Sequence, residues 1–112
     1  MSEEPAVIVR HYDLLRWLMG RVAKYPRDYR FTLGDRTIAL GLDVLEQLLE
    51  SAYSRSKAQS LRRADLSLAK LRYLVRLAKD ERCVSVKQYE FASREMAEIG
   101  KQIGGWRKQA GA

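Results

Sequence analysis

The sequence is poor in the residues that build disulfides, metal sites and membrane spans. Its only cysteine is Cys83, so neither an internal disulfide nor a cysteine-based metal cluster can form, which suits a reducing cytoplasm. The opening stretch Met1–Pro5 is acidic and no long apolar run follows it, unlike a signal peptide. No segment approaches the roughly 20 apolar residues of a membrane span. We therefore expect a cytoplasmic protein with no membrane contact.

The same scarcity argues against catalysis. The sole histidine, His11, has no evident serine or cysteine partner, whereas a hydrolase needs a nucleophile beside a base. Di-iron bundles take Glu-x-x-His pairs from facing helices, which one histidine cannot supply. The chain also lacks a P-loop and a glycine-rich dinucleotide motif. We expect no catalytic residues, no metal and no cofactor, and we predict that the protein is not an enzyme.

The sequence predicts a largely helical protein, with one domain over residues 1–112. Four stretches repeat apolar residues at steps of three and four, as amphipathic helices do. Pro26 separates the first two stretches, the Ser85–Gln88 pair matches a capping box, and Gly104 with Gly105 predicts a helix stop. The predicted helices span about residues 6–24, 29–54, 59–80 and 86–103, followed by a basic tail over 104–112. Short connections between them predict an all-α, antiparallel up-down four-helix bundle.

Each predicted helix has one apolar seam that we expect to face the bundle core. The seams are Ile8, Tyr12, Leu15, Met19 and Val22; Phe31, Ile38, Leu42, Leu45, Leu49 and Ala52; Leu61, Ala64, Leu68, Leu71, Val75 and Ala78; and Tyr89, Ala92, Met96, Ile99 and Ile103.

The second and third helices also carry an apolar stripe opposite the seam, where a lone bundle would be polar. A strip of that length is rarely left in water, so we interpret it as a self-association surface; the alternative is a wide core face. Gly34 and Gly41 lie one heptad apart, which a close approach of two helices would explain. The predicted oligomer interface consists of Leu33, Leu40, Val44, Leu48, Leu66, Tyr73 and Leu77.

The net charge of +7 is concentrated in one segment. Residues 55–82 hold nine basic and three acidic residues, whereas residues 27–54 hold three basic and five acidic ones. Rows of cations along the third helix suit successive phosphates, although an ordinary solvated face is the alternative. Trp106 could stack a base or tuck against the bundle end, and we favour the tuck. The predicted nucleic-acid-binding residues are Arg63, Lys70, Arg72, Arg76, Lys79, Arg107 and Lys108.

Three stretches resemble the accessory variability determinant of diversity-generating retroelements, a four-helix bundle family. They read YPRDYRFTLGDRTIALGLDVLEQLLESAY, LAKLRYLVRLAKD and VKQYEFASREMAEIGKQIGGW. The resemblance extends from about Tyr12 to Trp106, and its most specific parts are LRYLVRLAKD at Leu71–Asp80 and EIGKQIGGW at Glu98–Trp106. The bundle family named for the intervening-sequence protein of large-subunit ribosomal RNA shares this fold.

The resemblance implies a homopentameric barrel with a basic surface that binds nucleic acid and the reverse transcriptase of the element. Such proteins are required for making mutagenised cDNA from a template repeat RNA, which then replaces sequence in a variable gene. The family has no catalytic residues to carry over, and its basic helix positions would map to Arg63, Lys70, Arg72, Arg76 and Lys79. We therefore expect a non-catalytic accessory subunit that binds template RNA or an RNA–cDNA hybrid. The alternatives are an rRNA- or ribosome-associated bundle of the intervening-sequence type and a purely structural oligomer.

Overall fold

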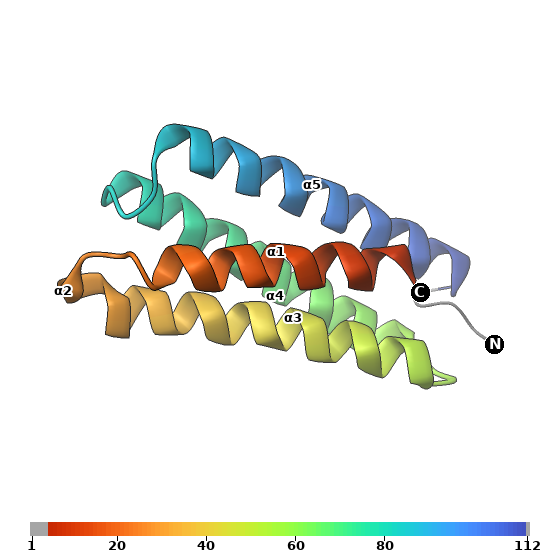
Figure 1. Cartoon of the computed structure of the whole chain (residues 1–112). Helices are drawn as coiled ribbons and strands as arrows, with labels where there is room; N and C mark the ends of the chain where they lie inside the picture. The colour runs from red at the N-terminus through yellow and green to blue at the C-terminus, as the bar shows by residue number, and fades with distance from the viewer. Residues whose placement is uncertain (1–4, 112) are drawn as a thin grey trace.

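The computed structural model describes residues 5–111, and its framework is four long helices joined by short turns. These are α1 (Ala6–Val22), α3 (Asp35–Tyr53), α4 (Ala58–Asp80) and α5 (Val86–Gln109). A single turn, α2 (Arg27–Tyr29), and a π-helical turn, η1 (Arg30–Gly34), lead directly into α3. The long helices run alternately in opposite directions, so the start of α1 and the end of α5 lie at the same end (Figure 1). The predicted all-α, up-down four-helix bundle is confirmed.

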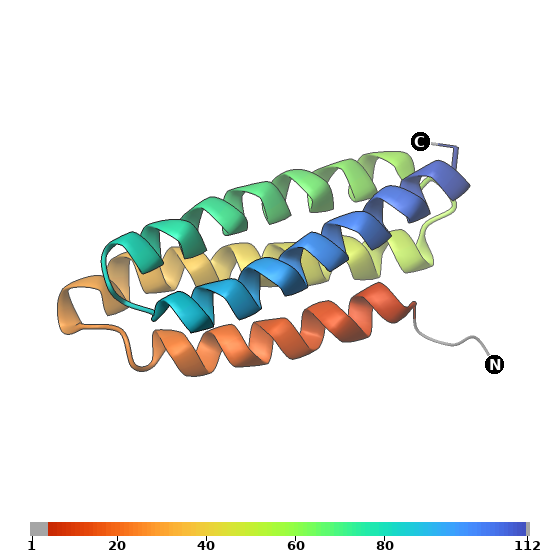
Figure 2. The same ribbon diagram turned by 90° about the horizontal axis from the view of Figure 1, so that it is seen from above.

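The four helices enclose one elongated core. Each long helix packs against the next along the chain, and α1 packs against α5 to close the ring, as the view from above also shows (Figure 2). The body measures 43 × 25 × 22 Å. A smaller apolar cluster of Val22, Tyr25, Ala78 and Val84 fills the end where the α1–α2 and α4–α5 turns lie. The bundle is therefore packed along its whole length.

The seams predicted for the last two helices are confirmed. Every seam residue of α4 is buried, and so is the α5 seam apart from the half-buried Tyr89. The predicted capping box is also present, since the Ser85 Oγ accepts from the Gln88 backbone N–H at 3.0 Å and Gln88 Oε1 accepts from the Ser85 N–H at 2.9 Å. On both helices the apolar residues at steps of three and four coincide with buried positions.

Two of the five seam residues predicted for α1 are wrong. Tyr12 and Met19 are 51% and 47% exposed, because the buried face of α1 is centred elsewhere. His11 occupies its centre with no exposed surface, and its Nε2 donates to the Gly41 carbonyl oxygen at 2.8 Å. That hydrogen bond offsets the cost of burying a polar ring. The face is completed by Val7, Ile8, Leu14, Leu15, Leu18 and Val22.

On the second helix the fully buried leucine and valine come from the predicted interface stripe, whereas the seam residues Ile38, Leu45, Leu49 and Ala52 are half-buried and pack against the apolar clusters. Val44 and Leu48 have no exposed surface and lie in the bundle core, so their prediction as oligomer-interface residues is wrong. Leu33 and Leu40 are half-buried and pack against the apolar clusters. Phe31, predicted to be core, is 69% exposed. The alternative of a wide core face is correct for this stripe.

Small residues explain why the buried face of α3 lies where it does. A Cβ atom at Gly34 would come within 2.6 Å of Val22 Cγ1, and one at Gly41 within 2.6 Å of Leu15 Cδ1. The close helix approach inferred from these two glycines is confirmed. Thr37, fully buried on the same face, donates its hydroxyl to the Leu33 carbonyl at 2.8 Å. Glycines and back-bonded hydroxyls thus form a contact face that an apolar count overlooks.

The predicted helix stop at Gly104 and Gly105 is wrong, since α5 continues to Gln109. Residues on either side anchor the last two turns: Ile103 is buried and Trp106 packs against the core. These contacts outweigh the low helix propensity of glycine, which costs about 1 kcal/mol relative to alanine. Residues 104–109 are therefore helix and not a tail, and the favoured tuck of Trp106 is confirmed.

Candidate nucleic-acid interface

The helix α4 presents its basic residues to solvent because its apolar seam faces the core. Lys70, Arg72 and Arg76 are exposed on this helix. Within residues 5–111, none of the three forms a salt bridge. Their cationic groups are thus free to meet an external anion, and Arg can do so with paired hydrogen bonds.

A shallow groove runs between α4 and α5 beside these cations. Its volume is about 380 Å³, and it is lined by Ala69, Arg72, Tyr73, Arg76 and Tyr89. The Tyr73 side chain is 70% exposed, and none of the lining residues is acidic. We call this feature the α4–α5 groove. It combines two guanidinium groups with an accessible aromatic ring.

Lys79 adds a third cation next to the groove. Its Nζ lies 4.7 Å from the centroid of the Tyr89 ring and 3.4 Å from Asp80 Oδ1. The cation–π contact fixes the lysine against the wall of the groove. Tyr89 was assigned to the core seam, and it is in fact half-buried, with its remaining surface in the groove. Tyr89 belongs to α5, so only the pairing of α5 with α4 reveals this second role.

The remaining predicted binding residues are dispersed. Arg63 Nη2 pairs with Glu50 Oε2 of α3 at 2.7 Å, which places it on the α3 side of α4. Arg107 Nη1 pairs with Asp65 Oδ2 at 2.9 Å, towards the other end of α4 from Lys79. Exposed ion pairs of this kind contribute little to stability. The structure therefore gathers three of the seven predicted residues at one groove and does not bring all seven together.

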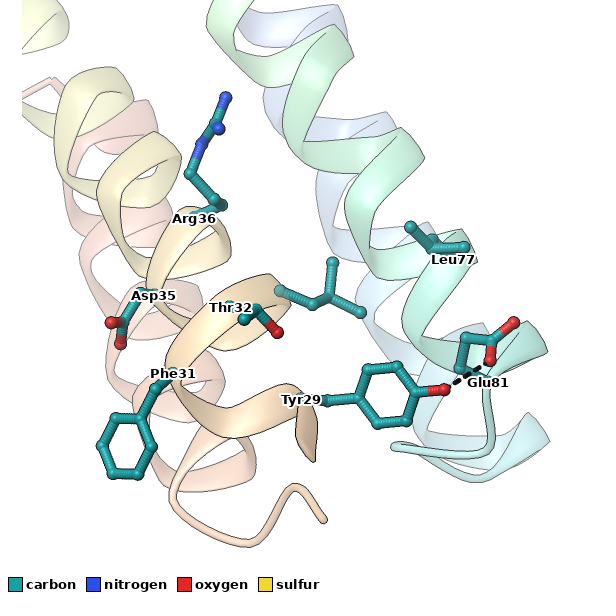
Figure 3. A pocket seen from close by; sticks show the side chains of 8 residues that line it. Tyr29, Phe31, Thr32, Asp35, Arg36, Leu77 and Glu81 are labelled. Atoms are coloured by element: carbon teal, nitrogen blue, oxygen red, sulfur yellow. Dashed lines mark hydrogen bonds between the residues drawn. The ribbon is translucent and has the colours of Figure 1, made fainter. Parts of the chain in front are cut away.

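A second hollow lies where η1 meets the end of α4 (Figure 3). Its volume is about 660 Å³, and Leu33 and Leu77, both predicted interface residues, are among its lining. The Tyr29 hydroxyl crosses to Glu81 Oε1 and donates at 2.7 Å. This hydrogen bond raises the pKa of the Tyr29 hydroxyl. Phe31 extends from the other side of the same helical turn.

A family model described as bAvd-like matches residues 6–110, which include all four long helices. The chain belongs to the bAvd-like family. This match confirms the resemblance to the accessory variability determinant family that the sequence indicates. No curated protein matches the chain.

This bAvd-like chain places its one histidine away from any surface. His11 is fully buried, and burial lowers the pKa of its imidazole more than the hydrogen bond from the ring to Gly41 raises it. Among residues 5–111, no group of three or more His, Cys, Asp and Glu side chains is arranged to hold a metal ion. Within the same residues, no helix is both long and apolar enough to span a membrane. The exposed features of the described residues are basic side chains and apolar side chains.

Two apolar faces remain exposed on the bAvd-like bundle. The first is the α1–α3 apolar face, which contains the exposed Tyr12, Met19 and Leu42 and the half-buried Ile38, Leu45 and Leu49. The second is the α4 apolar face, which contains Leu66 and Leu77 at 56% and 45% exposure; Tyr73, 70% exposed, lies beside it in the α4–α5 groove.

The helical wheel places the first of these faces. Tyr12 and Met19 fall next to Leu15, which contacts Gly41 of α3, and away from Arg10, which pairs with Glu95 of α5. On α3, the four residues of the face fall on the side of Gly34 and Gly41, which approach α1. The face is thus one continuous side of the α1–α3 pair. Since α4 stands diagonally across the bundle from α1, the two apolar faces look in different directions.

Proposed function

We propose that this protein is a non-catalytic, nucleic-acid-binding accessory subunit of a diversity-generating retroelement. In this role it binds template RNA or an RNA–cDNA hybrid together with the reverse transcriptase of the element, and so supports mutagenic retrohoming in the cytoplasm. The observation that carries the proposal is the pair of exposed, unpaired arginines, Arg72 and Arg76, beside the exposed ring of Tyr73 on α4. Membership of the bAvd-like family supports the same assignment.

The mechanism we propose is scaffolding. Arginine and lysine contacts to phosphates supply affinity and position the nucleic acid without reading its sequence. The polymerase docks on a separate protein surface. Assembly of several copies, proposed as a homopentamer, repeats the basic groove and multiplies weak contacts into tight binding. The apolar faces on α1–α3 and α4 provide surfaces for that assembly.

Charge reversal on α4 tests the nucleic-acid role. The test variant combines Arg72→Glu, Arg76→Glu and Lys79→Glu, and the probe is a fluorescently labelled structured RNA titrated at several salt concentrations. Each neutralised phosphate releases counterions, so the logarithm of the binding constant falls linearly with the logarithm of the salt concentration. Losing one phosphate contact makes this slope shallower by about one unit. We expect the triple variant to bind at least about 100-fold more weakly at low salt, with a slope flatter by about three units.

A matched control separates local contacts from overall charge. Arg16, Lys24 and Arg27 are exposed on α1, the following turn and α2, and none of them lines the α4–α5 groove. Reversing these three charges changes the net charge by the same amount. We expect RNA affinity to fall much less than in the α4 variant, with helicity and solution mass unchanged in both. Equal losses in the two variants would mean that affinity follows net charge and not the α4 groove.

The shared fold also keeps the intervening-sequence type of bundle as a second candidate, which would act on ribosomal RNA. Genomic neighbourhood separates the two, because an adjacent reverse transcriptase gene and paired repeats belong to the retroelement role. Co-purification supplies the biochemical test. Retention of the neighbouring polymerase supports the accessory-subunit proposal, whereas co-sedimentation with large ribosomal subunits contradicts it.

A further inference from the structure

The α4–α5 groove holds an aromatic ring that the core does not require. Tyr73 is 70% exposed and lines the groove together with Arg72, Arg76 and Ala69, whose small side chain leaves the groove open. Across the groove, Tyr89 already has Lys79 against its ring, so it forms a wall and offers less free aromatic surface. Tyr73 is therefore the one ring of the groove with an open face.

The charges of the groove match a polyanion and its aromatic ring matches a base. Arg72 and Arg76 are one turn apart on α4, about 6 Å along the axis, and neither is neutralised by a carboxylate within residues 5–111. In a duplex the faces of the bases are covered by their neighbours, so only the phosphates can reach such a site. In a single strand the bases can splay out and stack on an aromatic side chain while the phosphates follow the cations.

We propose that the α4–α5 groove binds single-stranded nucleic acid, with one base stacked on Tyr73 and the flanking phosphates held by Arg72 and Arg76. The inference rests on the proposed function, since it names the form of nucleic acid that this basic surface takes. It assigns Tyr73 to stacking, not to the interface between subunits where the sequence placed it. Each subunit of an assembly would then offer one such contact to an unpaired stretch of template or cDNA.

The test compares one strand with its duplex. The probes are labelled oligothymidine of about 20 nucleotides, longer than the roughly 4–16 nucleotides of common single-strand sites, and the same strand annealed to oligoadenosine. Tyr73→Ala should weaken binding of the single strand about tenfold or more, because stacking on one aromatic ring contributes that much. Duplex affinity and the salt slope should stay unchanged. Tyr73→Trp should restore single-strand binding, and Ala69→Leu, which fills the groove, should reduce it.

Two controls make the result specific. Tyr53 is 91% exposed at the end of α3, so Tyr53→Ala removes a ring that is more accessible than Tyr73 but lies outside the groove, and it should leave both affinities unchanged. Light scattering on each variant reports the solution mass. A fall in mass for Tyr73→Ala, parallel to the loss of affinity, would make Tyr73 a subunit contact and overturn the stacking proposal.

The failure of this inference is distinguishable from failure of the proposed function. Equal affinity of the wild type for single strand and duplex, with no effect of Tyr73→Ala on either, overturns stacking but leaves nucleic-acid binding in place. A wild type that binds neither oligonucleotide nor the structured RNA at low salt overturns both. Selective loss of single-strand binding in Tyr73→Ala at constant mass is the result that supports the inference.

Discussion

At the residue scale, His11 shows how one polar side chain shapes the centre of the bundle. Its ring has no exposed surface, and its Nε2 lies 2.8 Å from the Gly41 carbonyl oxygen. A carbonyl oxygen only accepts, so the proton of the neutral ring must sit on Nε2. The Nδ1 atom has no hydrogen-bond partner among residues 5–111. Protonation would therefore place a charge and an unpaired N–H in the apolar core.

This arrangement predicts that the protein loses stability in mild acid. Burial holds the pKa of His11 below its usual value near 6.5 in the folded state, so the unfolded chain binds more protons as the pH falls below about 6.5. The free energy of unfolding should be highest above that pH and decline below it, by at most about 1.4 kcal/mol per pH unit for this one group. Urea unfolding at a series of pH values measures the decline.

A substitution isolates the contribution of the histidine. His11→Gln keeps an N–H donor for the Gly41 carbonyl but does not titrate, so we expect lower stability at neutral pH and a flatter dependence between about pH 5 and 7. Carboxylates that titrate at lower pH are common to both proteins and cancel in the comparison. An unchanged pH dependence in His11→Gln would mean that His11 does not control acid stability.

Residues such as His11 also mark the limit of reading the core from apolar periodicity. Buried polar groups are normally hydrogen-bonded, and here the partner is a backbone carbonyl that the sequence cannot display. Ser51 and Ser60 behave in the same way, since both are buried and their hydroxyl oxygens lie 2.6 Å apart. A pattern of apolar residues leaves these positions out, and on α1 and α3 the inferred face is displaced from the buried one.

At the element scale, glycines at two places in the bundle have opposite roles. Gly34 sits where α3 meets α1, and an added Cβ would meet Val22 Cγ1 at 2.6 Å. Valine in a helix has essentially one side-chain rotamer, so it cannot turn aside. Gly104 has no atom within 4 Å of such a Cβ and lies inside the helix α5. One glycine is required by packing, and the other only weakens a helix.

The two sites predict alanine substitutions of opposite sign. Gly34→Ala should lower the free energy of unfolding by about 1–3 kcal/mol, the usual cost of overpacking a core. Gly104→Ala should raise it by about 0.5–1 kcal/mol, because alanine loses less backbone entropy in a helix. Chemical denaturation of both variants gives the two values.

Gly105→Ala is the internal check, since Gly105 is equally open and should behave like Gly104. A loss of stability in either of these two variants would indicate that α5 ends before Gly104 in solution. A neutral Gly34→Ala would indicate that α1 and α3 can separate slightly without cost. Either outcome contradicts the helix contacts described above.

The difference between α4 and the pair α1 and α3 explains how much of the fold could be predicted from the sequence. The number, order and approximate limits of the helices follow from periodicity, proline and capping signals, and α4 reads correctly at every seam position. For α1 and α3 the apolar residues outnumber the buried positions, so several sets satisfy the same period. Choosing among them requires the contact of Gly41 with Leu15, which is a property of two helices together. The groove beside Tyr89 likewise depends on how α4 and α5 pair.

At the scale of the whole molecule, the surplus of apolar residues reappears as two separate exposed faces. The α1–α3 apolar face and the α4 apolar face point in different directions, as the helix contacts place them. A closed ring of identical subunits is built from heterologous contacts, in which one patch meets a different patch on the next copy. A twofold dimer would instead use one self-complementary patch. Two distinct faces favour the ring, in agreement with the proposed homopentamer.

A mixing experiment tests this arrangement. Leu42→Asp places a charge on the α1–α3 apolar face and Leu66→Asp places one on the α4 apolar face, and both positions are already partly exposed. A charge buried in an apolar interface is costly, so each variant alone should fall to the mass of a single chain while keeping its helicity. In a mixture, Leu42→Asp supplies an intact α4 apolar face and Leu66→Asp supplies an intact α1–α3 apolar face. One copy of each should therefore pair into a dimer. Light scattering measures all three samples.

The outcomes distinguish ring, dimer and core. In a twofold assembly through the α4 face, Leu42→Asp would stay associated and mixing would add nothing. Val44→Asp is the control for burial: because Val44 has no exposed surface, its charge should abolish the fold itself and not only the assembly. If Val44→Asp remained helical and merely dissociated, Val44 would belong to the interface after all, as its place on the second stripe of the sequence first indicated. A mixture that recovers dimers from two monomeric variants requires two different faces in one contact, which only the heterologous arrangement provides.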